Sequence, residues 1–353
     1  MTSVTESKSQ RGDTPASPAP EQAAQEPQKA AQHQRRPEIA TEAPPGWSYN
    51  PSAWSQRFPI LTLALISFAI ATYLALCEVG VLRAAWDPFF GQGTTRILHS
   101  GIAQAFPIPD AVIGAGFYLL EMICLLLGDA RRWYTKPWLV LSFGLLVIPL
   151  GLTSLILMML QPIVVGNWCS LCLVVAACTF LLAALASDEV VAACQFLITS
   201  ARVGDSLWET FWHGGRRSQE AENARNEADA SRPAPFQGLN VPWSLLVNIA
   251  LGCWLLAAPP LLQGHGQAAH SNYVVGALVL AGSIVALSEV ARPVRFLCVV
   301  CGVWLLLFAP WTLLDASYAL KINDVCVGVA LIVLSFRRGP VRENYNGWNH
   351  MII

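Results

Sequence analysis

The chain has 353 residues, of which 54% are apolar and 13% charged, and its formal net charge is −1. Soluble domains average about 25% charged residues. Residues 137–187 and 233–288 contain no Asp, Glu, Lys or Arg. As helix, either segment would be more than twice as long as the ~30 Å bilayer core. These features exclude an ordinary soluble enzyme and predict a multi-pass membrane protein, and the near-neutral charge argues against a nucleic-acid partner.

Apolar segments bounded by turn residues predict eight membrane spans. They cover approximately residues 58–79, 111–128, 137–160, 168–187, 243–262, 273–290, 296–314 and 320–336. The expected fold class is all-α integral membrane, with a four-helix bundle followed by a second four-helix unit. With the N-terminus inside, 19 of the 22 Lys and Arg residues lie on the inner side. The positive-inside rule therefore predicts cytosolic termini, and we expect a bacterial inner membrane.

The segments outside the spans complete the expected domain organisation. Residues 1–57 are rich in Ala, Gln and Pro, a composition typical of a disordered cytosolic tail. Val203, Leu207 and Phe211 stand at helical spacing, which predicts an interfacial amphipathic helix followed by a linker. The remaining expected domains are a four-helix domain over 58–187, the cytosolic helix and linker over 188–240, a membrane domain over 241–338 and a cytosolic tail over 339–353.

The second half of the chain contains an internal repeat. Gly252, Trp254 and Pro260 recur fifty residues later as Gly302, Trp304 and Pro310, so two helical hairpins are expected. This half resembles the SPW-repeat membrane family, with Ala309-Pro310-Trp311 in the second copy and Ala258-Pro259-Pro260 in the first. Two interpretations stay open: a ligand site at the prolines, or helix ends anchored by interfacial Trp. The resemblance implies no chemistry.

Two C-x-x-C pairs stand out among ten cysteines. Cys169 and Cys172 begin the fourth span on the outer side, where a cap at Asn167 would place both sulfurs in the first helical turn. A helix N-terminus stabilises a thiolate, and the outer compartment is oxidising. The pair is therefore either redox-active or simply packed. Cys298 and Cys301 face the cytosol and are expected to be structural. No metal site is expected, because the two pairs lie at opposite faces.

Three sequence pieces carry a family resemblance over residues 58–186. They are Tyr73-Leu74-Ala75-Leu76 with the later Ile97-Leu98-His99-Ser100; Ile108 to Gly114, continuing to Tyr118; and Asn167-Trp168-Cys169-Ser170-Leu171-Cys172. This region resembles the vitamin K epoxide reductase family, four-helix membrane enzymes that couple disulfide chemistry to a quinone.

The resemblance implies a role for several residues. Cys172 would react with a quinone of the ubiquinone or menaquinone class, and Cys169 would be its partner, which exchanges with the outer loop. Asp110 would hydrogen-bond a quinone oxygen, and Ser100 matches a Ser or Thr of the family's loop. Tyr118 belongs to the same set of quinone-binding candidates. The expected electron donor is a periplasmic thiol protein, and the lipid bilayer is the other partner.

The chain also departs from the family pattern. Members normally carry two cysteines in the loop after the first span, whereas residues 83–110 contain none. The positions where those two cysteines would be expected are occupied roughly by Trp86, Asp87 and Gly93. Cys77 is therefore either an altered relay or a packed core residue. The missing loop cysteines keep an alternative function open, a non-catalytic membrane scaffold or interaction protein derived from this fold.

Glu121 is an unusual residue for a membrane span. It lies 11 residues beyond Asp110, so a helix would place it ~16 Å deep. An intramembrane carboxyl group is energetically costly and usually faces the bundle interior. We expect Glu121 either to carry protons for quinone reduction, as part of the quinone site, or to be a protonated acid bonded to a neighbouring helix.

Overall fold

The computed structural model describes residues 43–101, 103, 107–215, 235–309 and 317–352. Over these residues, all of the regular secondary structure is helical. Six helices are long and apolar enough to cross a membrane. The predicted fold class, an all-α integral membrane protein, is confirmed.

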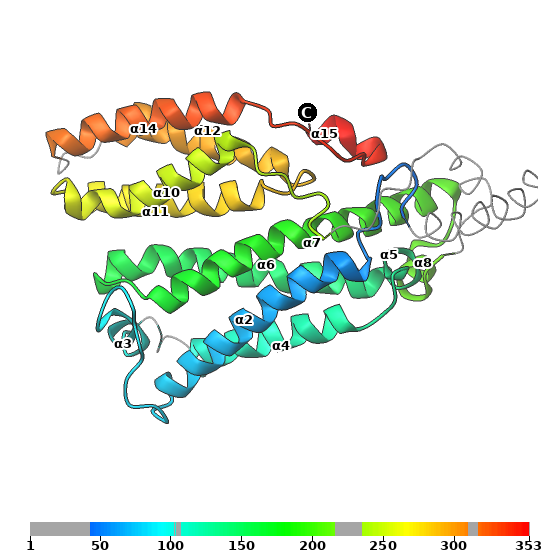
Figure 1. The fold of residues 1–353 in the computed structure, drawn as a ribbon, viewed down its shortest axis with the longest axis horizontal. Coiled ribbons are helices and arrows are strands. Elements are labelled where there is room, and N and C mark those ends of the chain that lie inside the picture. Colours follow the sequence, from blue (N-terminus) through cyan, green and yellow to red (C-terminus); the bar gives the residue numbers. More distant parts are fainter. Residues whose placement is uncertain (1–42, 102, 104–106, 216–234, 310–316, 353) are drawn as a thin grey trace, which may run out of the picture. The chain divides into compact units, whose positions relative to one another are not determined.

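The first bundle consists of four helices that pack in a ring (Figure 1). They are α2 (Trp54–Glu78), α4 (Asp110–Leu126), α6 (Pro137–Leu160) and α7 (Ser170–Val203), and α6 continues into the π-helical turn η2 (Gln161–Val165). Each helix contacts two neighbours, in the order α2, α4, α6, α7 and back to α2. The core of this first bundle includes Ile60, Phe143 and Leu182.

The second bundle is built from two hairpins. It contains α10 (Trp243–Leu261), α11 (Gly266–Val285), α12 (Phe296–Val303) with its π-helical continuation η4 (Trp304–Phe308), and α14 (Tyr318–Phe336). In each hairpin the two helices cross where one glycine faces another. A Cβ at Gly302 would lie 2.8 Å from the carbonyl oxygen of Gly328, and one at Gly276 would lie 3.0 Å from that of Gly252. Only glycine permits this approach.

The two hairpins also exchange tryptophan hydrogen bonds. Trp254 of the first hairpin donates to Asn323 Oδ1 of the second at 2.7 Å. Trp304 of the second hairpin donates to Ser271 Oγ of the first at 2.9 Å. The repeat therefore has a reciprocal structural role in joining the hairpins. The Pro310 and Trp311 positions of the motif lie outside the described residues.

Two of the eight expected spans are not among the six long apolar helices. Helix α4 has 17 residues, roughly 25 Å of helix against a ~30 Å core. Helix α12 passes into η4, and residues 310–314 of this expected span lie outside the described residues. The other six expected spans coincide with the six long apolar helices.

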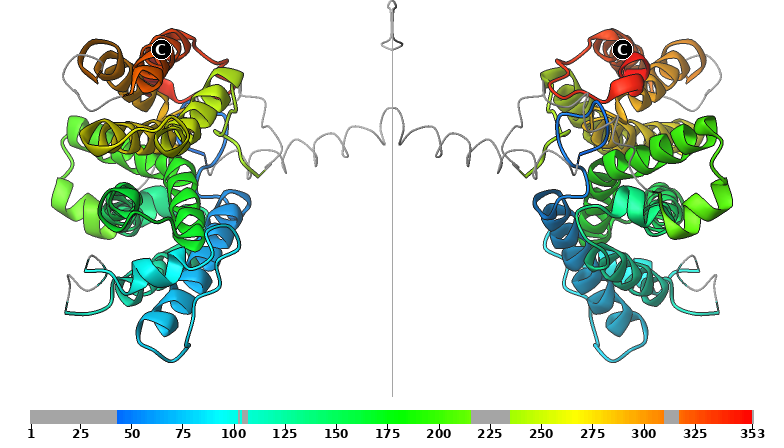
Figure 2. Two further views of the ribbon diagram at one scale, coloured as in Figure 1. Left: turned by 90° about the vertical axis from the view of Figure 1, so that its left-hand side faces the viewer. Right: turned by 90° about the vertical axis from the view of Figure 1, so that its right-hand side faces the viewer.

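Helix α11 joins the two bundles by packing against α6 and α7 (Figure 2). Ala277 and Ala281 of α11 contact Met158 and Phe180 of the first bundle. For orientation, the end of the molecule that carries Cys169 and the loop 79–109 is called the Cys169 end. The opposite end, at the start of α2, is called the Arg57 end.

The chain at the Arg57 end differs from the expected tails. Residues 1–42 of the tail expected over 1–57 lie outside the described residues, but Trp47 and Tyr49 are buried and α2 already begins at Trp54. The other expected tail, 339–353, contributes the buried Tyr345 and Ile352. Trp47 packs edge-on against Tyr345 at 4.9 Å between ring centroids. Aromatic burial therefore holds these segments together.

Helix α7 also extends beyond its predicted end at residue 187. It passes through Asp188 and Glu189 and ends at Gly204, whose φ is +97°. Both acidic side chains are buried with partners: Tyr49 donates to Asp188, and Arg132 forms an ion pair with Glu189. The predicted amphipathic helix is shorter than expected, α8 (Leu207–His213).

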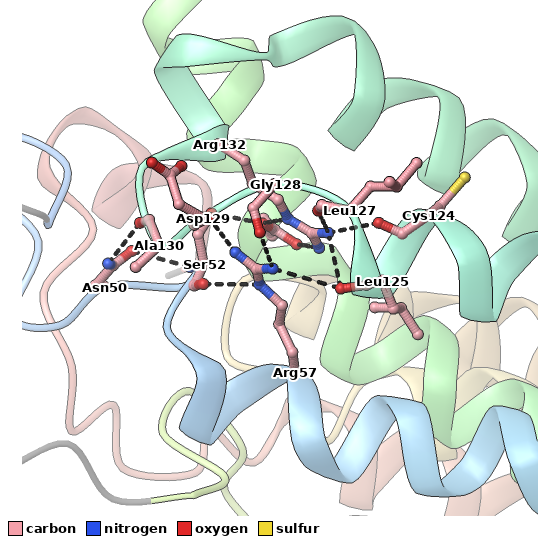
Figure 3. A network of polar contacts seen from close by, with 11 residues as sticks. Asn50, Ser52, Arg57, Cys124, Leu125, Leu127, Gly128, Asp129, Ala130 and Arg132 are labelled. Atoms are coloured by element: carbon pink, nitrogen blue, oxygen red, sulfur yellow. Dashed lines mark hydrogen bonds and ion pairs between the residues drawn. The ribbon is translucent and has the colours of Figure 1, made fainter.

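Two buried arginines cap the end of α4 (Figure 3). Arg57 donates to the carbonyl oxygens of Ser52, at 2.8 Å, and Gly128, at 3.0 Å. Arg132 donates to the carbonyl oxygen of Cys124 at 2.7 Å and pairs with Glu189. The last carbonyls of a helix lack intrahelical partners, so these guanidinium groups satisfy oxygens that would otherwise be buried and unpaired.

Candidate disulfide and cavity site

Cys169 and Cys172 form a disulfide, with 5.3 Å between their Cα atoms. Helix α7 begins at Ser170, and Cys169 is its N-cap, because its Sγ accepts a hydrogen bond from the amide of Cys172 at 3.1 Å. The expected cap at Asn167 is therefore wrong. The amide group of Asn167 instead donates to the carbonyl oxygen of Val165 and accepts from Arg96.

A tight reversal brings the disulfide back toward α6. Gly166 adopts a φ of +67° after η2, a conformation that glycine tolerates best. Gln161, buried in η2, accepts a hydrogen bond from the amide of Cys169 at 3.0 Å. Gln161 thus fixes the backbone at the first cysteine. Our sequence analysis missed this residue, although an amide side chain eight residues before Cys169 in an otherwise apolar span was a usable signal.

A cavity of about 270 Å³ lies beside the disulfide, between α2, α4, α6 and α7. Cys172, Asp110 and Tyr118 all line it, so the structure brings three predicted site residues together. The rest of the lining is mainly apolar, with Gln161 and Thr153 among the polar exceptions. Cys169 does not line the cavity and is 0% exposed, so the two cysteines have different surroundings.

The polar groups of the cavity are held by neighbouring helices. The Tyr118 hydroxyl lies 2.6 Å from Thr179 Oγ1. The carboxyl groups of Asp110 and Glu78 hydrogen-bond to each other, and the amide of Ala111 donates to Glu78 at 3.4 Å. Two ionised carboxylates that lie this close would repel each other. The pair is therefore most stable when the two groups share one proton. The sequence analysis missed Glu78, which comes directly after Cys77.

Three other predicted site residues do not line the cavity. Ser100 donates to the carbonyl oxygen of Ile97 at 2.7 Å and so ends the short helix α3 (Gly93–Leu98). Glu121 is fully buried in α4, and among the described residues neither of its oxygens has a hydrogen-bond partner. A neutral acid is the less costly form in such surroundings. The expected bond from Glu121 to a neighbouring helix is absent over the described residues.

Cys77 lies close to the redox pair but is enclosed. It is 3% exposed and belongs to an apolar cluster with Leu74 and Leu98, against which Cys172 packs. Membrane-buried thiols of this kind are usually inert. The surroundings of Cys77 therefore favour a packing role over a relay.

Asp87 fastens the outer loop to the disulfide segment. Its Oδ1 accepts hydrogen bonds from the Ser170 hydroxyl and from the amides of Phe89 and Phe90. Its Oδ2 accepts from both the amide, at 3.1 Å, and the hydroxyl, at 2.7 Å, of Thr94. Ser170 stands between the two cysteines, so this one carboxylate ties the loop, α3 and the start of α7 together.

The electrostatics of Asp87 agree with this geometry. Partial burial acts to raise its pKa, but the hydrogen bonds from Ser170, Thr94 and the loop amides outweigh burial. The pKa of Asp87 therefore lies well below its usual value. The carboxylate stays ionised, which strengthens each hydrogen bond that it accepts.

Helix α3 packs against the turn that precedes Cys169. A Cβ at Gly93 would collide with the carbonyl oxygen of Trp168, so glycine alone allows the helix to approach this closely. The side chains of Arg96 and Asn167 add a hydrogen bond of 3.1 Å between α3 and the same turn. The complete burial of Cys169 is consistent with this contact.

Two segments of the chain match known protein families. Residues 58–187 match the Vitamin K epoxide reductase family. This matched segment holds the disulfide, the cavity and Asp87. Residues 242–338, the second bundle, match the SPW repeat domain. Both parts of the predicted fusion are confirmed. No curated protein and no solved structure gives a significant match to the chain.

The cavity of the matched segment is compatible in size and lining with a quinone head group. Ligand pockets commonly run from ~300 to ~1,000 Å³, so about 270 Å³ suits a single ring better than a whole long-chain lipid. Asp110 and Tyr118 provide polar groups among apolar walls, which is the usual composition of such a pocket. Cys172, half of the disulfide, lies in the wall of the same cavity.

Proposed function

We propose that this chain is a membrane thiol–disulfide oxidoreductase that passes electrons from a thiol protein through Cys169 and Cys172 to a quinone. One observation carries the proposal: a disulfide whose second cysteine lines an apolar cavity together with Asp110 and Tyr118. The match of residues 58–187 supports it. A bound quinone would supply a two-electron acceptor of the ubiquinone or menaquinone class.

The proposal includes an orientation. Because 19 of the 22 Lys and Arg residues fall on one side of the predicted spans, we assign that side to the cytosol. The Cys169 end then faces the periplasm of a bacterial inner membrane. Disulfides persist in that compartment, and thiol proteins that need an oxidant are folded there.

The different surroundings of the two cysteines assign their roles. An external thiolate attacks Cys169, the S–S bond breaks, and Cys172 leaves as a thiolate at the cavity wall. A second external thiolate then attacks the mixed disulfide, which releases the oxidised partner and the Cys169 thiol. Cys172 stands in the first turn of α7, where the helix N-terminus favours its thiolate. Asp110 and Tyr118 orient the cavity's occupant, and the Asp110–Glu78 pair holds a proton beside it.

Access to Cys169 is the step that the fold restricts. Because Cys169 is fully covered, an external thiol can reach it only after α3 and its loop move away from Trp168. Asp87 opposes this movement through its bonds to Ser170 and Thr94. The loop would therefore control reaction with partners without a loop cysteine of its own.

The test uses the full chain in isolated membranes. The thiols are reduced, quinone is added, and the state of Cys169 and Cys172 is followed by thiol-labelling mobility shift. We expect quinone to restore the disulfide in the wild type and in Cys178→Ala, a matched control on the same helix outside the pair. The Cys172→Ala variant should remain fully labelled.

A second candidate function is a non-catalytic scaffold. The specific observations in its favour are that the loop carries no cysteine and that Cys169 is fully buried. If the two thiols stay labelled with every quinone supplied, while reduction and unfolding controls show that both can be labelled, the scaffold replaces the enzyme as the proposed function.

A further inference from the structure

Two arginines of the second bundle are buried without enough partners. Arg292 and Arg295 form the ends of a short 3-10 turn, η3 (Arg292–Arg295), which joins α11 to α12. They are 1% and 2% exposed. A guanidinium group carries five N–H donors, and burying such donors unpaired is costly. The turn is therefore a place where a hydrogen-bond acceptor is required.

The first bundle shows how this chain normally treats a buried arginine. Arg57 and Arg132 are just as buried, yet the Nε, Nη1 and Nη2 atoms of both have acceptors (Figure 3). In contrast, Nε and Nη2 of Arg292 and Nε of Arg295 have no partner among the described residues. The two pairs of arginines are equally buried, and they differ in how many hydrogen-bond acceptors the protein provides for them.

Glu289, the carboxylate whose charge acts on Arg292, already has several hydrogen-bond donors. Glu289 accepts hydrogen bonds from the amides of Arg342, at 2.9 Å, and Glu343, at 3.2 Å. It also accepts from Asn240 and Tyr345, both at 3.2 Å. Over the described residues, no ion pair links Glu289 to Arg292; the bond of Arg292 that the structure gives is to the carbonyl oxygen of Pro340 at 3.3 Å.

Further positive charge surrounds the turn. Burial lowers the pKa of Arg295, and the positive charges of Arg292 and Arg338 lower it further. Burial also lowers the pKa of Arg292, although Glu289 partly offsets this effect. Arg337, at the end of α14, lies 5.4 Å from the ring centroid of Trp243. A bound anion would relieve this repulsion and would also accept hydrogen bonds from the unpaired N–H groups.

We propose that Arg292 and Arg295 bind the phosphate group of an anionic ligand at the Arg57 end of the second bundle. A phosphate offers several oxygens to two guanidinium groups, and arginine pairs with it bidentately. The turn lies between two membrane helices, where basic pockets bind phospholipid head groups. The same phosphate chemistry also exists in free inorganic phosphate, so the experiment separates these two sources.

The experiment uses the full-length protein, stripped of lipid in detergent. Phosphatidylglycerol, phosphatidylcholine and inorganic phosphate are added separately, with sodium chloride as an ionic-strength control. Retained lipid is counted by native mass spectrometry, and thermal unfolding is followed in parallel. We expect phosphatidylglycerol to bind and raise the unfolding midpoint more than phosphatidylcholine does. If inorganic phosphate reproduces the effect and displaces the lipid, the site accepts free phosphate; if it does neither, the lipid is the ligand.

Variants show whether the two arginines are responsible. Arg292→Gln and Arg295→Gln should each weaken phosphatidylglycerol binding about tenfold or more, since each removes charge-assisted hydrogen bonds. Arg202→Gln, an exposed control at the end of α7, should bind as the wild type does. If a buried variant fails to fold, the exposed Arg338→Gln should still weaken binding severalfold. Equal binding of both lipids with no effect of phosphate, or unchanged binding in these variants, would overturn the proposal.

Discussion

Asp87 shows how much a single loop residue can organise at the Cys169 end. Its two oxygens accept five hydrogen bonds from the loop, from α3 and from Ser170. The family resemblance implies a covalent, redox-active link in this region. In this chain the link from the loop to the disulfide segment is an ionised carboxylate, so its strength depends on pH rather than on redox state.

The pKa of Asp87 predicts the direction of that dependence. Because hydrogen bonding lowers the folded-state pKa below the unfolded value of ~3.9, the stabilisation is complete above that pH and is lost as pH falls through the folded-state pKa. Asp87→Asn should lower the free energy of unfolding by about 1–2 kcal/mol at neutral pH, a charge-assisted bond being worth about that much. The deficit should shrink below about pH 4.

Thermal unfolding from pH 7 to pH 3 measures this difference. Asp205→Asn, at an exposed position after α7, is the matched control and should follow the wild type at every pH. A deficit for Asp87→Asn that stays constant down to pH 3 would show that the side chain acts through something other than its charge.

At the scale of elements, the proposed function makes the position of α3 the control on access to Cys169. The helix approaches Trp168 only because residue 93 is glycine. Gly93→Ala adds a methyl group at a backbone contact that cannot yield, so α3 must move outward. We expect the Cys169–Cys172 disulfide to become accessible, and its reduction by an external thiol to accelerate about tenfold, which corresponds to roughly 1.4 kcal/mol of lost closure.

Reduction kinetics with a membrane-impermeant thiol reagent measure this change. Gly101→Ala is the control, since it stands near the same helix and a Cβ there would meet nothing within 4 Å. Equal reduction rates for Gly93→Ala and the wild type would mean that α3 does not limit access to Cys169.

The elements also show where the sequence was sufficient. Long apolar runs predicted six membrane helices correctly, because burial in lipid leaves few alternatives to helix. The family resemblance implied a shared site for Cys172, Asp110 and Tyr118, and these three residues do line one cavity. Cys169, Ser100 and Glu121 do not line it. Helix ends were harder. The cap by Cys169 depends on its own sulfur, and α7 passes Asp188 because partners from distant segments compensate the buried charge.

At the scale of the whole described chain, polar contacts between distant segments connect the two bundles. Asp188 of α7 accepts a hydrogen bond from Tyr49 at 2.7 Å and another from Ser288 at 3.2 Å. Ser288 also lies 2.8 Å from Ser187. The two residues of each contact lie 100 or more positions apart in the sequence, so no local pattern could predict these contacts. The predicted tail and linker gave no sign of them.

Tyr49→Phe tests whether this network stabilises both bundles. Burial and the negative charge of Asp188 raise the pKa of Tyr49 well above its usual value, so the phenol stays neutral and donates at physiological pH. Loss of the Tyr49 hydroxyl leaves the buried Asp188 carboxyl group short of a donor, and we expect about 1–3 kcal/mol of destabilisation.

Tyr318→Phe is the control. Tyr318 is 80% exposed at the start of α14, so this change should alter the unfolding midpoint little. Hydrogen exchange should show increased opening in α7 and in residues 286–291 together. Increased opening on only one side would show that the two bundles are stabilised independently, because a shared network must transmit the loss to both.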